Sequence, residues 1–185
     1  SGLKGSGDYG VSGVGVFNGQ GANRPALSDD MHVIGRVSYP FKFGEQFVEV
    51  GTGGYWGKYY VSTAEDGPYT RPEGGKIDDA RAIASLMVYP QPFGFAAEAN
   101  VGICPSQGNR GADDRDEVRA RKLWGGYAQA MYKADGLFGT VAFIPYLRAS
   151  YYDGGKKFEL NAQHYQVAEI EFGIEWQILK ALELV

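Results

Sequence analysis

The sequence contains little of what several folds and activities require. Its single cysteine, Cys104, has no partner in the chain for a disulfide. Its only histidines, His32 and His164, are not spaced in any recognisable Ser-His-acid arrangement. We expect His32 to line the inner wall of the β-structure predicted below and to have no catalytic role. No stretch approaches the roughly 20 consecutive apolar residues of a membrane-spanning helix. We therefore expect no enzyme, catalytic residues, metal or cofactor, and no helical membrane protein.

Composition limits the class of protein further. The 185 residues predict one domain, in which 28 glycines and 14% aromatic residues are typical of twisted β-strands joined by turns. The net charge of -4 argues against nucleic acid as a partner. No signal peptide is recognisable, so we expect a chain that is mature, truncated or not exported.

Short segments that alternate apolar and polar residues recur along the chain. In residues 31–41, Val33 and Val37 point one way while Arg36 and Ser38 point the other. Between such segments, short connections alternate with long polar ones. This combination is typical of outer-membrane β-barrels, whose short turns are periplasmic and whose long loops are extracellular.

The pattern predicts an all-β fold, an antiparallel transmembrane β-barrel. We expect strands at about 8–18, 31–40, 47–61, 79–89, 94–103, 118–133, 139–152, 164–177 and 181–185. The first segment begins in a turn and the last stops halfway through its pattern. We therefore expect residues 1–185 to be a single, incomplete segment, about eight to nine strands of a larger barrel.

Charge on the second face of each strand predicts a wet lumen. In residues 165–177, Glu169 and Glu171 alternate with Ile170 and Phe172, and carboxylates cannot face lipid. The pore-lining candidates on this face are Arg36, Glu49, Arg81, Glu98, Asn100, Arg119, Arg121, Arg148, Glu169, Glu171 and Glu175. The residues expected to be exposed on the outer surface are Val33, Val37, Ala82, Ala84, Ala97, Ala99, Phe143, Ile170, Phe172 and Ile174.

Aromatic residues gather beside the short connections, as an interfacial girdle requires. They are Tyr39, Phe41, Phe43, Phe47, Tyr89, Phe93, Phe95, Tyr132, Phe138 and Trp176. The alternative is that aromatic residues favour strand ends in any β protein.

Two further motifs carry less information. The acidic run Asp113, Asp114, Asp116 and Glu117 offers hard oxygen ligands for Ca²⁺ or Mg²⁺, but its spacing is not that of a calcium loop, and a solvated loop is the preferred interpretation. The glycine-rich residues 51–58 lack the spacing of a phosphate loop and lie within a predicted strand. Their glycines let the strand bend or let another chain approach closely.

Five stretches, taken in order, resemble a known family. They are YGVSGVGVFNGQG at 9–21, GRVSYP at 35–40, YPQPFGFAAEAN at 89–100, GYAQAMY at 126–132 and IPYLRASYYDGGKKFELN at 144–161. Together they are similar to the phosphate-selective porin O and P family of Gram-negative outer membranes. The resemblance implies a sixteen-stranded, homotrimeric porin.

In that family, phosphate selectivity is attributed to a ladder of arginines and a lysine cluster. Here the expected lumen carries arginines and glutamates together, so charge alone predicts no strong anion preference. Opposed charges across a pore instead create a transverse field. The alternative role for each arginine is to pair with a carboxylate on a neighbouring strand and hold the wall rigid.

These observations predict a porin in the cell outer membrane that passes small hydrophilic or anionic solutes or ions by diffusion. Its expected partners are the lipid bilayer, lipopolysaccharide and identical subunits of a trimer. One alternative is a small, complete eight-stranded barrel with an adhesion or envelope-anchoring role. Another is a soluble β-barrel binding protein, with its polar face outward. Burial and closure of the sheet distinguish the three.

Overall fold

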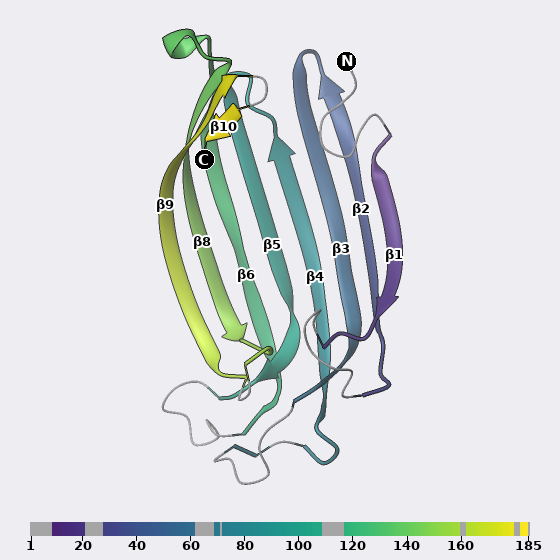
Figure 1. The fold of residues 1–185 in the computed structure, drawn as a ribbon. Coiled ribbons are helices and arrows are strands. Elements are labelled where there is room, and N and C mark those ends of the chain that lie inside the picture. Colours follow the sequence, from purple (N-terminus) through teal and green to yellow (C-terminus); the bar gives the residue numbers. More distant parts are fainter. Residues whose placement is uncertain are drawn as a thin grey trace.

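The computed structural model describes residues 9–20, 28–61, 69–70, 72–108, 117–159, 162–179 and 182–184, which form one antiparallel sheet without an α-helix among them (Figure 1). The strands are β1 (Val11–Phe17), β2 (His32–Phe43), β3 (Gln46–Tyr60), β4 (Lys76–Val88), β5 (Phe93–Ser106), β6 (Arg119–Tyr132), β7 (Ala134–Asp135), β8 (Ala142–Gly155), β9 (His164–Leu179) and β10 (Leu182–Leu184). The all-β prediction is therefore confirmed.

Strand order follows chain order, from β1 at one edge of the sheet to β10 at the other. The two-residue β7 pairs only with β8, beside a single 3-10 turn, η1 (Leu137–Gly139). Short connections lie at one end of the sheet and long ones at the other (Figure 1). Among the described residues β1 and β10 do not pair, so the sheet does not close into a barrel.

Strands differ from the predicted bounds mainly at the end with the long connections. β4 begins at Lys76, β8 continues to Gly155, and β5 runs to Ser106, so Cys104 lies buried in a strand and not in a loop. These extensions pair within the ladder and support a buried polar cluster described below. At the opposite end β8 starts only at Ala142, because η1 occupies the residues before it.

The register of the strands places apolar side chains on one face of the sheet and polar side chains on the other, because directly paired residues point to the same side of an antiparallel sheet. We call the side that carries Val37, Ala84, Ala99, Ala128 and Ile170 the apolar face. We call the side that carries the predicted pore-lining residues the polar face. One example of the separation is Ala149 paired with Ile170, followed directly by Arg148 paired with Glu171.

The apolar face is not covered by other parts of the described chain. Val33 is 50% exposed and Ile170 82% exposed. Of the ten residues expected to be exposed, eight are exposed, while Ala97 and Phe143 are half-buried and none is buried. The buried hydrophobic cluster of the described chain lies instead at the end with the long connections. It contains Tyr59, Val61, Ile77, Val118 and Ala162.

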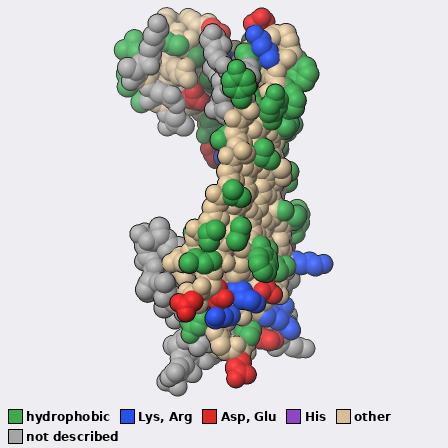
Figure 2. Space-filling view, turned by 90° about the vertical axis from the view of Figure 1, so that its right-hand side faces the viewer, with side chains coloured by type: hydrophobic (Ala, Val, Ile, Leu, Met, Phe, Trp, Pro, Cys, Tyr) green, Lys and Arg blue, Asp and Glu red, His purple; other side chains and the backbone are tan. Residues whose placement is uncertain are grey.

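The sheet is bowed, as the edge-on view from the β1 side shows (Figure 2). The polar face is its concave side. This follows from Lys157, in the connection after β8, whose ammonium group contacts Asp79 of β4 although β5 and β6 lie between β4 and β8 in the sheet. A flat sheet would place those strands about 14 Å apart.

Candidate functional site

All predicted pore-lining residues lie on the polar face. Register places Arg36, Arg81 and Arg148 there from β2, β4 and β8, and Glu98 from β5. The remaining candidates on this face are Glu49, Asn100, Arg119, Arg121, Glu169, Glu171 and Glu175. The structure therefore brings the set together on the concave side.

The arginines divide into two groups by their partners. Arg119 pairs with Glu117 at 3.5 Å, and Arg121 donates from Nε to the Ser106 carbonyl at 3.3 Å. Arg36, Arg81 and Arg148 form no ion pair within the described residues, so a wall-stabilising salt bridge does not account for these three.

Arg148 illustrates the second group. Its guanidinium lies 3.9 Å from the centre of the ring of Tyr127, which is on the neighbouring strand β6. This is a cation-π contact. Glu171 is directly opposite on β9, yet its carboxylate accepts a hydrogen bond from the Tyr146 hydroxyl at 2.5 Å. Cation and carboxylate are thus neighbours on the concave face and are held by separate tyrosines.

A buried polar cluster lies at the long-connection end of this face. The His32 Nε2 and Asp79 Oδ2 atoms are 2.9 Å apart, and both side chains are fully buried. Tyr55 donates its hydroxyl proton to Asp79 Oδ1 at 3.1 Å. Lys157 pairs with Asp79 Oδ2 and also donates to the Tyr55 hydroxyl at 3.2 Å. The Asp79 carboxylate therefore joins β2, β3, β4 and the connection after β8.

Two glycines make room for the histidine of this cluster. A Cβ atom on Gly57 would lie 2.6 Å from His32 Cγ, and one on Gly19 would overlap the imidazole ring. Gly19 also has a φ of +68°, which L side chains rarely adopt. The Phe17 ring stacks on His32 with centroids 5.4 Å apart. Gly57 thus serves close packing within this chain.

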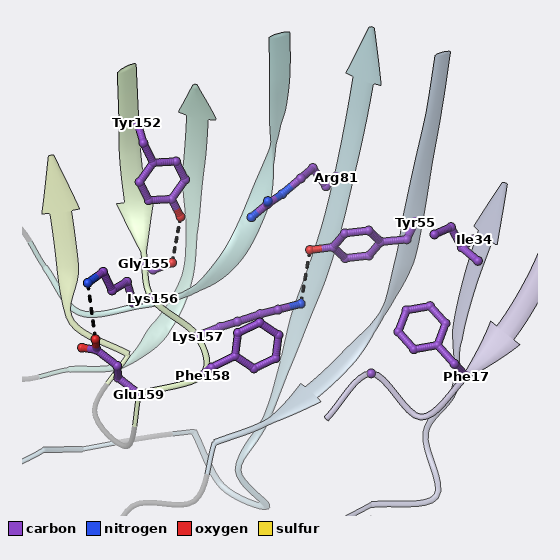
Figure 3. Close-up of a pocket in the computed structure, with 11 residues that line it drawn as sticks. Phe17, Ile34, Tyr55, Arg81, Tyr152, Gly155, Lys156, Lys157, Phe158 and Glu159 are labelled. Carbon is purple, nitrogen blue, oxygen red and sulfur yellow. Dashed lines mark hydrogen bonds and ion pairs between the residues drawn. The ribbon is translucent and has the colours of Figure 1, made fainter. Parts of the chain in front are cut away.

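The connection after β8 and the polar face border an open cavity of about 590 Å³ (Figure 3). Its walls include Phe17, Ile34, Tyr55, Arg81, Tyr152 and residues 155–159. Lys157 extends from the connection toward Tyr55, with Phe158 beside it (Figure 3). Sequence reasoning found His32 and Arg81 but missed Asp79, Tyr55 and residues 155–159, because only strand register and loop placement bring them together.

The apolar face is a band bordered by aromatic rings at both ends. At the short-turn border, Phe93 and Tyr132 have ring centroids 5.2 Å apart, and Phe143 and Trp176 6.0 Å apart. At the long-loop border, Trp124 and Tyr151 are 4.5 Å apart. The sequence predicted the aromatic residues beside the short turns but not those beside the long loops.

No described strand carries a charged side chain on the apolar face between the two borders. On β6 the band extends from Trp124 to Tyr132. That is about 27 Å along the strand, or roughly 21 Å of height at the tilt of about 40° usual in membrane barrels.

Charges begin immediately beyond the long-loop border. On the same side of the sheet, Lys58 pairs with Asp78 at 2.9 Å, and Lys76 pairs with Asp30 at 2.7 Å. The hydrogen bond from Lys76 lowers the pKa of the half-buried Asp30 carboxyl. Apolar and charged zones are therefore separated along the strands as well as between the two faces.

Some expectations lie outside the described residues. Asp113, Asp114 and Asp116 of the acidic run belong to a range that is not described, and only Glu117 is. In the described part of the chain no group of His, Cys, Asp or Glu side chains is arranged to hold a metal ion. No helix in that part is long and apolar enough to cross a membrane. No family model, curated protein or solved structure matches the chain.

Proposed function

We propose that the chain is part of an outer-membrane porin, a water-filled channel for passive diffusion of small hydrophilic or anionic solutes. The apolar face would contact lipid and the concave polar face would line the channel. The lipid bilayer, lipopolysaccharide and two further copies of the protein would be its partners, as the family resemblance implies.

The main support for this proposal is the uncharged band of the apolar face. Large side chains such as Ile170 and Phe172 are 82% and 71% exposed, which is unfavourable in water and favourable in hydrocarbon. Aromatic borders at both ends and ion pairs beyond one of them repeat the order of a bilayer: apolar core, interface, water. The band height of roughly 21 Å is close to the about 25 Å typical of outer-membrane barrels.

The polar face supports a channel better than a plugged interior. Arginines and glutamates stand on it together: Arg148 of β8 lies directly opposite Glu171 of β9, and Glu98 of β5 stands one strand away from Arg81 of β4. A wet surface with charges of both signs orients dipolar solutes and gives no strong preference for ions of either sign.

The unpaired edges favour a larger barrel over a complete eight-stranded one. A small closed barrel requires hydrogen bonds between β1 and β10, and the described residues contain none. In hydrocarbon each unpaired strand edge is strongly unfavourable. We therefore propose that β1 and β10 pair with further strands of a sixteen-stranded barrel.

A planar-bilayer experiment on the full-length protein tests the proposal. Correctly folded protein, verified by the shift in gel mobility between unheated and heated samples, should produce stepwise, ohmic conductance. Heat-denatured protein at the same detergent concentration is the control and should produce none. Absence of conductance from folded protein would reject the porin function.

A further inference from the structure

The cavity under the connection after β8 has the size and lining of a small-molecule site. Its volume of about 590 Å³ falls within the range of roughly 300–1,000 Å³ common for such sites. Aromatic and aliphatic side chains form most of its walls, and its cationic groups are Arg81, Lys156 and Lys157. An apolar lining with a few fixed charges selects a ligand that has both an apolar body and a charged group.

Of these three cations, only Arg81 lacks a carboxylate partner within the part of the chain that the structure describes. Lys157 pairs with Asp79, and Lys156 pairs with Glu159 at 3.5 Å. Arg81 forms no ion pair within the described residues, and its buried Nε has no hydrogen-bond partner there. Its guanidinium carbon lies 6.0 Å from the centre of the ring of Tyr55, a neutral group. One uncompensated guanidinium thus faces the cavity, and guanidinium matches the two oxygens of a carboxylate.

Two aromatic rings are held in place on either side of the cavity. Phe17 stacks on the buried His32, and Phe158 packs edge-on against Tyr59 with centroids 6.0 Å apart. Figure 3 shows Phe158 on the connection after β8 and Phe17 on the opposite side, with Tyr55 along the wall between them. Rings fixed in this way offer flat apolar surfaces on which another ring can stack.

We propose that this cavity binds a small aromatic carboxylate, with its carboxylate on Arg81 and its ring between Phe17 and Phe158. The site would give the channel a preferred solute, and to that extent the proposal rests on the proposed porin function. Binding itself requires only the folded protein, so it can be measured apart from conduction.

Calorimetric titration of the detergent-solubilised full-length protein with benzoate tests the site. Arg81→Gln should lower the affinity by roughly tenfold or more, because a hydrogen-bonded charge pair is lost. Arg81→Lys keeps the charge but not the paired donors, and should lower it less. Phe158→Leu should also weaken binding. The matched control is Lys122→Gln, which removes a cation outside the cavity and should leave the affinity unchanged.

Comparison of probes separates this site from a simple anion site. Benzoate should bind about tenfold or more tightly than acetate or inorganic phosphate, since only benzoate offers a ring. Equal affinity for the three anions, or equal affinity of wild type and Arg81→Gln for benzoate, would overturn the proposal. Conductance of the same preparations without benzoate is the separate readout. Conductance without benzoate binding rejects the site alone, and binding without conductance rejects the porin function alone.

Discussion

Lys157 and Asp79 form an ion pair across the concave face, although they are far apart in sequence and their elements are separated by two strands of the sheet. Asp79 is fully buried and Lys157 is 12% exposed. This pair, with His32 and Tyr55, holds the connection after β8 against the polar face. The connection and that face together line the cavity of about 590 Å³.

Asp79→Asn should release the connection after β8. Removing one partner of a buried ion pair leaves the other charge uncompensated and destabilises by about 3–5 kcal/mol. Trypsin should then cleave faster after Lys156 and Lys157, and the midpoint of unfolding in denaturant should fall. The control is Asp78→Asn, at the next residue, whose ion pair with Lys58 is exposed. Asp78→Asn should lower the free energy of unfolding by about 1 kcal/mol or less. Equal cleavage rates in the two variants would contradict the proposed anchoring.

Gly57→Ala should disturb the same cluster through packing alone. The new Cβ atom would lie 2.6 Å from the His32 ring, which is held between Phe17 and Asp79 and cannot move freely. We expect a loss of about 1–3 kcal/mol in the free energy of unfolding. Gly13→Ala provides the control, because a Cβ atom there has no neighbour within 4 Å. If the two variants unfold at the same denaturant concentration, the glycine is not required for close packing.

The sequence was informative where apolar and charged residues alternate over several positions of a strand. In β9, Ile170, Phe172 and Ile174 alternate with Glu169, Glu171 and Glu175, so both the strand and its two faces could be predicted from period alone. The buried polar cluster could not be predicted from period. His32, Asp79 and Lys157 meet only because register aligns β2 with β3 and β4 and because a loop folds inward, and neither fact is local to any segment.

Adjacent residues of β6 test which face meets lipid. Ala128 lies near the middle of the apolar band, and Gln129 lies on the polar face. Ala128→Arg should destabilise the protein folded in lipid vesicles by about 2–4 kcal/mol, the effect of a cation near the midplane. Gln129→Arg adds the same charge to the wet side and should change stability little. Urea-dependent unfolding in vesicles measures both, and equal losses would contradict a lipid-facing band.

Arg148 tests which charges face the permeating ions. It has no carboxylate partner within the described residues and lies on the concave face opposite Glu171. Arg148→Glu should therefore shift the reversal potential of the full-length protein toward cation selectivity in a planar bilayer. The shift should be modest, because a water-filled pore keeps a high effective dielectric, and largest at low salt, where the Debye length reaches about 30 Å at 0.01 M.

The control for this measurement is Lys122→Glu, which makes the same change of charge on the other side of the sheet. Its side chain is exposed and points away from the concave face, so ions in the lumen should be screened from it. A shift for Arg148→Glu alone places Arg148 in the conduction path. An equal shift for both variants means that the polar face does not line the channel, since selectivity then follows net charge and not position.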